Sequence, residues 1–270
     1  MFNAIAAFAG WNDAGAAATD AVRRLVKALD ASPAGSISPQ GYCDLQVNRP
    51  LVRLNKQGLR EIVWPETEIF RAQAPGGGEL VLVVGVEPSF RWIDFADDLL
   101  TRITELGVDR LWLAGALLAD MPHTRPFPVQ TGSTSPALVE QFEAEKPLYE
   151  GPAGIVAVLG HQAEHRYKLE SGSLWVPVPH YVGNPPSPKA ELALVARMAE
   201  VLGLEGLDTA ELAEEARAWT EGVEALASGD PEVAGYVSAL EEAADELAST
   251  KGSGEALAKE FERYLRRHGS

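Results

Sequence analysis

The stretch Leu111–Val129, LWLAGALLADMPHTRPFPV, decides the predicted fold. Its first part, LWLAGALLA, is entirely apolar, which is typical of a strand buried on both faces of a sheet. The run then changes into a loop that holds Asp120, His123 and Arg125 among prolines. Because ligands of open α/β sheets bind at the carboxyl ends of the strands, this loop is the first place at which a functional site is expected.

Other apolar runs extend this pattern along the chain. Further buried strands are predicted at Phe2–Ala9, Leu80–Val86, Gly154–Leu159 and Leu174–Val182, with short strands around Leu45–Leu54 and Glu61–Trp64. Helices are predicted at Ala16–Leu29 and Trp92–Leu106, from Ser135-Pro136, and from Ser187-Pro188 to about Leu202. Ala31–Gly41 is predicted to be a loop, and the two prolines of the last run favour an edge or irregular strand. The alternation of strands and helices predicts an α/β fold with a mainly parallel sheet.

The composition changes after Gly206. Residues 206–270 hold 15 acidic and 6 basic residues, with helix start signals at Asp208 and Asp230-Pro231. Gly252–Gly254 interrupts the pattern before a further helical stretch, Glu255–Arg267. The sequence therefore predicts an α/β domain, residues 1–205, and an acidic all-helical extension, residues 206–270, whose apolar faces must pack on the core or on another subunit.

The charge and the cysteine content limit the function classes. A net charge of −16 argues against nucleic acid or an anionic membrane as the main partner. No apolar run approaches the roughly 18 residues that a membrane span needs. The start of the chain, MFNAIAAFAGW, lacks the basic lead-in of a signal peptide, and the single cysteine, Cys43, excludes an internal disulfide. A cytoplasmic protein is expected.

Polar side chains follow several predicted strands and form the candidate ligand site. The candidate residues are Asn12, Asp13, Glu87, Asp120, His123, Arg125 and His180. Carboxylates, imidazoles and a guanidinium in one cleft suit a phosphorylated or nucleoside-like ligand. The structural alternative is that Asp120 and Arg125 pair with each other and fix their loop, since ion pairs also cluster in loops.

Motifs for specific chemistry are few. The chain has no G-x-S-x-G, Walker A or G-x-G-x-x-G pattern, so no catalytic residue is assigned and no cofactor is expected. His161 and His165 match H-x-x-E-H, an inverted zinc-protease pattern, and would lie one helical turn apart. The pattern is short and a third ligand would have to come from elsewhere, so a metal site there is the weaker alternative.

Six stretches in order resemble one family. They are GWNDAG (10–15), GVEPSFRW (85–92), LAGALLADMPHTRP (113–126), YEGPAGIVAVL (149–159), SLWVPVPHYV (173–182) and PPSPKAELAL (185–194). Together they resemble the actinobacterial PAC2 family, named after the proteasome assembly chaperone 2, over about residues 2–204. The resemblance implies a phosphorylase/hydrolase-like three-layer α/β sandwich, homo-oligomers, and kinship with the eukaryotic and archaeal proteasome-assembly chaperones. It implies no catalytic residues.

Two functions follow as expectations. The first is a non-enzymatic, cytoplasmic protein-interaction module that presents an oligomeric surface to a protein partner such as proteasome subunits; an exposed apolar patch would mark it. The alternative is a small-molecule-binding protein or phosphorylase/hydrolase-like enzyme that uses the strand-exit cleft. The chain ends Arg267-His268-Gly269-Ser270, unlike the hydrophobic-Tyr-X ending of ring-docking chaperones of this group. Docking by that ending is therefore not expected.

Overall fold

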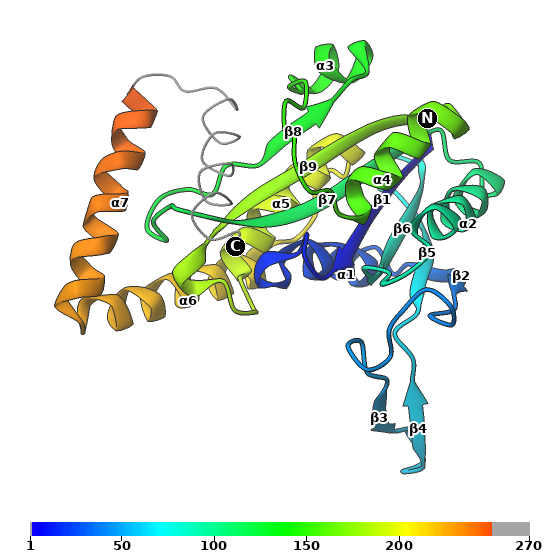
Figure 1. The fold of residues 1–270 in the computed structure, drawn as a ribbon, viewed down its shortest axis with the longest axis horizontal. Coiled ribbons are helices and arrows are strands. Elements are labelled where there is room, and N and C mark those ends of the chain that lie inside the picture. Colours follow the sequence, from blue (N-terminus) through cyan, green and yellow to red (C-terminus); the bar gives the residue numbers. More distant parts are fainter. Residues whose placement is uncertain (1, 250–270) are drawn as a thin grey trace.

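The computed structural model describes residues 2–249 of the chain (Figure 1). The strands are β1 (Asn3–Ala9), β2 (Ser32–Ile37), β3 (Leu51–Leu54), β4 (Arg60–Val63), β5 (Thr67–Gln73), β6 (Glu79–Val86), β7 (Arg110–Ala119), β8 (Gln130–Ser133) and β9 (Glu170–Pro179). The helices are α1 (Ala17–Ala28), α2 (Trp92–Glu105), α3 (Pro136–Phe142), α4 (Ile155–Gln162), α5 (Pro188–Leu202), α6 (Ala210–Ser228) and α7 (Pro231–Ser249), with short turns η1 (Ala14–Ala16), η2 (Ala163–Tyr167) and η3 (His180–Val182). Across residues 2–249, no helix has both the length and the apolar character needed to cross a bilayer.

The central sheet has seven strands in the order β2-β5-β6-β1-β7-β9-β8. Its middle is parallel, because β1 pairs in parallel with β6 and β7, and β7 pairs in parallel with β9. Antiparallel strands complete both edges: β5 and β2 on one side and β8 on the other. The apolar runs predicted to be strands at β1, β6 and β7 are thus the buried centre of a mainly parallel sheet, as expected.

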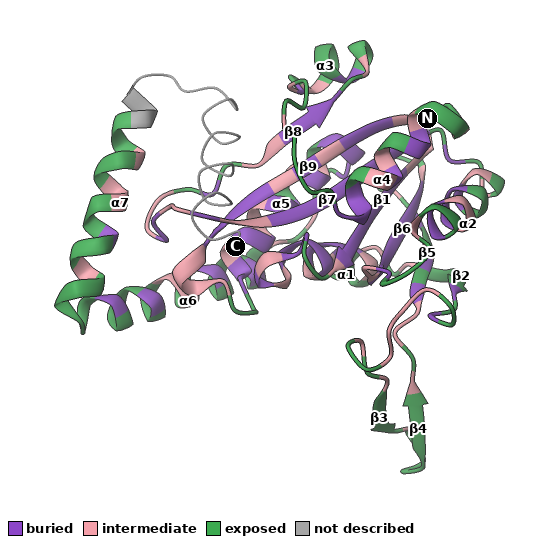
Figure 2. Cartoon of the chain, in the orientation of Figure 1, coloured by how far each residue is buried: buried purple, intermediate pink, exposed green. Residues whose placement is uncertain are grey.

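Helices cover both faces of the sheet (Figures 1 and 2). On one face, α1 and α5 pack against the side of β7 that carries Trp112, and the ring of Trp112 is fully buried there. On the other face, α2 and α4 pack against Leu111 and Leu113. Successive residues of β7 serve opposite layers because side chains alternate along a strand. The three-layer α/β architecture is therefore confirmed.

The prediction of a strand at Gly154–Leu159 is wrong, because this segment begins helix α4. Ile155, Val156 and Leu159 are buried against the sheet, at spacings that one face of a helix provides. A short apolar run fits a buried helix turn as well as a buried strand, so periodicity alone does not separate the two.

Three sheet strands lie where none was predicted. Ala31–Gly41, predicted to be a loop, contains β2, an exposed edge strand whose sequence SPAGSI has no apolar alternation. β8 is the opposite edge strand, and β5 lies between β2 and β6, with buried and exposed residues alternating along much of its length. The prolines of β9 did not make it an edge strand along its length. Pro177 and Pro179 pair only with β7, since the pairing of β8 ends at Trp175, so the prolines lie where β9 has one neighbouring strand.

The extension is helical over its described part and packs on the α/β body. Leu212 of α6 is fully buried in the same core cluster as α1 and α5. Arg24 of α1 joins the elements: its Nε lies 2.5 Å from Glu191 Oε1 of α5 and its Nη2 lies 2.9 Å from Glu215 Oε2 of α6. The predicted interruption at Gly252–Gly254 and the helix Glu255–Arg267 lie outside the described residues.

Strands β3 and β4 form a separate hairpin that projects from the body of the molecule (Figure 1). We call residues 47–64 the hairpin arm. The arm is inserted between β2 and β5, at one edge of the sheet. Figure 2 shows it exposed almost throughout, in contrast to the buried strands of the central sheet.

Candidate functional site

The carboxylate of Asp13, in the turn between β1 and α1, accepts hydrogen bonds from the first turn of α1. Its Oδ1 accepts hydrogen bonds from the backbone N–H groups of Ala18 (2.7 Å) and Thr19 (3.3 Å), and its Oδ2 accepts one from the Thr19 hydroxyl (2.5 Å). Burial raises the pKa of Asp13, although these hydrogen bonds act in the opposite direction. An acceptor here satisfies N–H groups that have no partner within the helix.

Glu87, after β6, has the same role at α4. Its Oε1 accepts hydrogen bonds from Asn12 Nδ2 (2.9 Å) and from the backbone N–H of Ile155 (2.8 Å), the first residue of α4. Asn12 is buried between them. Asn12 and Glu87 therefore tie together the ends of β1 and β6 and the start of α4.

The loop after β7 makes its contacts with the C-terminal half of the chain. Asp120 Oδ1 lies 3.2 Å from His180 Nδ1. Arg125 forms a bidentate pair with Asp245 of α7, with Nε–Oδ1 and Nη2–Oδ2 distances of 2.8 Å, and its Nη1 lies 3.1 Å from Glu241 Oε1. The alternative in which Asp120 pairs with Arg125 is thus wrong: each has a partner from another element.

His123, in the same loop, is fully buried. The hydroxyl of Tyr181 accepts a hydrogen bond from the His123 backbone N–H (2.8 Å) and lies 2.8 Å from His123 Nδ1. On the other side of the ring, Nε2 lies 3.1 Å from Glu224 Oε2 of α6. Burial lowers the pKa of His123 and outweighs the opposite effect of Glu224; burial also raises the pKa of Tyr181 to about 12.

The lowered pKa of His123 makes the stability of the fold depend on pH. The unfolded chain takes up a proton near the ordinary pKa of 6.5, whereas the folded protein stays neutral at His123 to lower pH. This stabilisation is present above pH 6.5 and is lost as the pH falls through the lowered pKa. We expect the free energy of unfolding, measured with urea, to fall less between pH 7.5 and pH 5.5 in His123→Gln than in the wild type. The exposed His161→Gln is the control; an unchanged pH dependence in His123→Gln would contradict the assignment.

The seven candidate residues thus form two groups and do not surround one cavity. Asn12, Asp13 and Glu87 join β1 and β6 to the helices α1 and α4. The other four, from the two segments that follow β7 and β9, face one another or the extension. Of the seven, Asn12 and Asp13 line the large cavity of the molecule, which we call the sheet-face groove.

The sheet-face groove has a volume of about 840 Å³ and lies over β7, β9 and β8, beside α4 and the segment 145–154. Apolar and aromatic side chains contribute much of its lining: Trp11, Leu117, Leu148, Tyr149 and Trp175. A glycine in β7 shapes its floor, because a Cβ at Gly115 would lie 2.4 Å from the ring of Trp175. The ring therefore lies close against the backbone of β7.

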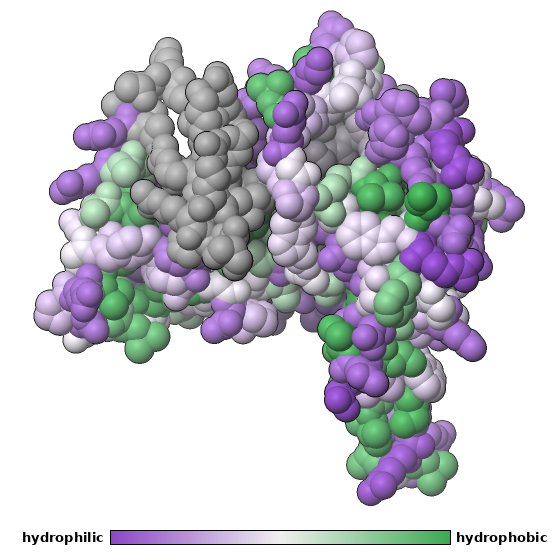
Figure 3. Space-filling model, viewed as in Figure 1, coloured by the Kyte–Doolittle hydropathy of each residue, from purple (hydrophilic) through white to green (hydrophobic). Residues whose placement is uncertain are grey.

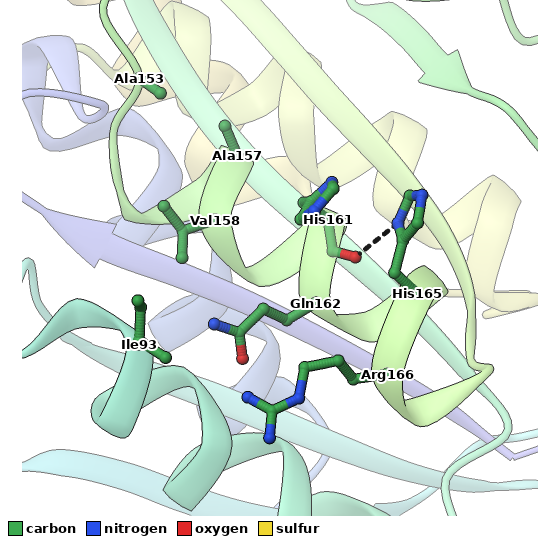
Figure 4. Close-up of a pocket in the computed structure, with 8 residues that line it drawn as sticks. All are labelled: Ile93, Ala153, Ala157, Val158, His161, Gln162, His165 and Arg166. Atoms are coloured by element: carbon green, nitrogen blue, oxygen red, sulfur yellow. Dashed lines mark hydrogen bonds between the residues drawn. The ribbon is translucent and has the colours of Figure 1, made fainter.

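Acidic and imidazole side chains complete the groove. Glu145 and Glu164 are among its lining residues, together with His161 and His165. The two imidazole rings stack with their centroids 4.2 Å apart, and His165 Nδ1 is 2.9 Å from the His161 carbonyl oxygen (Figure 4). Within the described part of the chain, no three histidine, cysteine or acidic residues are grouped so as to hold a metal ion. The described chain thus brings no third ligand to the proposed zinc pair.

A second depression, of about 520 Å³, adjoins the groove at helix α4 and shares Ala153, Ala157, His161 and His165 with its lining (Figure 4). Ile93 of α2 and Val158 of α4 form its apolar walls, and Arg166 lies at its end. Its lining differs from that of the sheet-face groove, because it contains no tryptophan, tyrosine or phenylalanine.

The hairpin arm is the exposed apolar feature that the sequence analysis did not single out. It carries seven large apolar side chains that are about half exposed or more: Val47, Leu51, Val52, Leu54, Leu59, Ile62 and Trp64. Figure 3 shows apolar residues along the arm. Its charges are Arg49, Arg53, Lys56 and Arg60 against a single acid, Glu61. Basic residues alternating with apolar ones, in a chain of net charge −16, are the signal that marks this segment.

Comparisons with known proteins agree with this architecture. The model of the PAC2 family matches residues 7–227. No curated protein matches the chain. A PAC2 family protein from Streptomyces avermitilis is 44% identical, with a TM-score of 0.81 over 88% of this chain and 100% of that chain.

Two further similar structures have proteasome-related names. A proteasome-assembly chaperone homologue from Mycobacterium tuberculosis is 42% identical, with a TM-score of 0.77 over 87% of this chain and 99% of that chain. An archaeal proteasome activator from Pyrococcus furiosus shares the fold, with 19% identity and a TM-score of 0.66 over 83% of this chain and 92% of that chain. The family model covers the end of β1, strands β2–β9, both helical layers and most of α6. The chain belongs to the PAC2 family.

Proposed function

We propose that this protein is a non-enzymatic, cytoplasmic protein-interaction module that works as a homo-oligomer and binds a proteasome-related protein partner. The observation that carries the proposal is the hairpin arm. Seven exposed large apolar side chains gather on one projecting hairpin, and such a concentration of exposed apolar surface is typical of protein–protein interfaces. A two-stranded hairpin is marginally stable by itself in water, so contact with a partner also stabilises its shape.

The contacts of the polar residues at the strand ends favour a role in protein–protein interaction over the binding of a small molecule. Asp13 and Glu87 are engaged as helix caps, and Arg125 is engaged by two acids of α7. An anion or a nucleoside at these groups would have to replace contacts that hold the helices in place. The names of two similar structures, a proteasome-assembly chaperone homologue and an archaeal proteasome activator, suggest the class of partner.

The test is co-elution with purified proteasome core particles and their isolated subunits from the same organism. The arm variant Val52→Asp/Ile62→Asp places two charges on paired positions of one hairpin face. Leu226→Asp is the matched control, because Leu226 of α6 is 79% exposed and lies far from the arm in the sequence. We expect the wild type and Leu226→Asp to co-elute with the partner, and the arm variant to bind at least about tenfold more weakly. Absence of wild-type co-elution, or equal binding by the arm variant, would contradict the proposal.

A further inference from the structure

Resting on this proposed function, we propose that the hairpin arm of one copy docks into the sheet-face groove of a second copy. The chain then assembles head to tail, with two different surfaces meeting at each contact. The occupant of both surfaces is thus a second copy of this chain, and the arm then serves partner binding by building the multimer that presents the partner surface. The argument rests on the chemistry of the arm, the chemistry of the groove, and their places in the fold.

One face of the arm carries three large apolar side chains and one arginine. In the β3–β4 pairing, Val52 lies opposite Ile62 and Leu54 lies opposite Arg60. Since side chains alternate along a strand, Val52, Leu54 and Ile62 share a face of the hairpin. Leu54 is 68% exposed, so this face has no covering within the described chain. An apolar surface on another molecule would remove this face from water.

The groove offers such a surface. Its floor is the open face of β7 and β9, where Trp175 lies against Gly115, and its wall includes Trp11 and Leu148. Trp11 is 51% exposed and Leu148 is 65% exposed. Removing apolar surface from water is favourable, so a contact that covers the arm and the groove at once stabilises both.

Charge favours the same pairing. Each copy has a net charge of −16, so two copies repel each other over most of their surfaces. The arm has the opposite charge, with four basic side chains and one acidic side chain between Val47 and Trp64. The groove carries Glu145 and Glu164 in its lining. A basic, apolar arm therefore complements an acidic, apolar groove.

The topology keeps arm and groove apart on one molecule. The arm emerges between β2 and β5, which form one edge of the sheet, whereas the groove reaches β8, which forms the opposite edge. The arm also points away from the sheet (Figure 1). A contact between two different surfaces of identical chains is heterologous, and it produces a ring when its rotation closes.

Complementary variants test this arrangement on the purified protein alone. The arm variant is Val52→Asp/Ile62→Asp, the groove variant is Trp11→Lys/Leu148→Lys, and the control is Leu226→Lys. The substituted side chains are all at least half exposed, so folding should be retained, and thermal unfolding of each variant verifies this. The readout is the mass of the native assembly relative to one chain of 28.9 kDa.

A head-to-tail contact predicts a specific pattern of masses. The wild type and the control form the same multimer, and each of the two variants alone is a single chain. An equimolar mixture of the two gives a species of two chains and no larger one, because one intact arm meets one intact groove. A groove variant that keeps the wild-type mass would overturn the proposal, since the arms would then pair with each other. A mixture that recovers the full multimer would overturn it as well.

A wild-type protein with the native mass of one chain would also overturn the inference. The binding of proteasome subunits then shows what occupies the arm. Binding of proteasome subunits that depends on the arm would show that the partner fills this role, and the proposed function would stand. Conversely, arm-dependent assembly without any binding of proteasome subunits would uphold the inference and contradict the proposed function.

Discussion

Replacing Gly154 by alanine is expected to lower the free energy of unfolding by about 2–4 kcal/mol, from overpacking together with loss of a helix cap. A Cβ at this position would lie 2.0 Å from Asn12 Nδ2 and 2.6 Å from Asn12 Cγ. Asn12 cannot move away freely, because its Nδ2 donates to Glu87 and its backbone oxygen accepts from the Ala116 N–H at 2.8 Å. The same Glu87 oxygen caps α4, so the displacement would disturb helix and sheet together.

Two comparisons make this result specific to the contact. Gly222→Ala in α6, where no neighbouring atom lies within 4 Å of the new Cβ, is expected to raise the stability by about 0.5–1 kcal/mol. In an Asn12→Ala background, which removes the obstructing amide, Gly154→Ala should cost much less. Urea unfolding of the four proteins of this cycle measures the coupling. A full cost of Gly154→Ala in the Asn12→Ala background would contradict the proposed clash.

Reversing the charge of Arg125 is expected to release helix α7 from the body of the protein. An isolated exposed ion pair contributes little. Arg125, however, binds Asp245 in a bidentate manner and also contacts Glu241, and Thr124 donates a hydrogen bond to the same Glu241. Val237 is the buried hydrophobic side chain among the described residues of α7, so the polar contacts hold much of this helix. Arg125→Glu would place three acids together.

Hydrogen exchange measures the release directly. In Arg125→Glu, we expect the backbone amides of residues 231–246 to exchange at least about tenfold faster, with unchanged exchange in β1 and β7. Adding Asp245→Arg restores an ion pair with the opposite polarity and should recover part of the protection. High salt should accelerate exchange in the wild type and much less in Arg125→Glu. Equal protection of α7 in the wild type and in Arg125→Glu would show that the apolar contacts of the helix suffice.

The centre of the fold could be predicted from the sequence, because strands buried on both faces read as continuous apolar runs. The runs at β1, β6 and β7 have this character, and each is flanked by an amphipathic helix or a glycine turn. The run 154–159 has the same composition but covers one face of the sheet as a helix. The edge strand β2 depends on backbone pairing with β5, and this pairing leaves no pattern in its side chains.

The candidate site could be predicted less well, because strand ends collect polar residues for two reasons. One is ligand binding, and the other is the capping of the helix that follows or packs nearby, as with Asp13 and Glu87. Which applies depends on contacts distant in the sequence, such as that of Arg125 with Asp245, 120 residues away. Exposure of the hairpin arm depends likewise on where β2 and β5 place it.

The most direct test of the interaction account is to find what the arm touches. A photo-crosslinking amino acid at position 54, in place of Leu54, would sit on the apolar face of the arm in the purified protein alone. The account predicts a crosslink between two chains, with the attached peptide coming from the walls of the sheet-face groove, at residues 145–165 or at Trp11. Illumination that produces no crosslink between chains, or one that joins arm to arm, would contradict it.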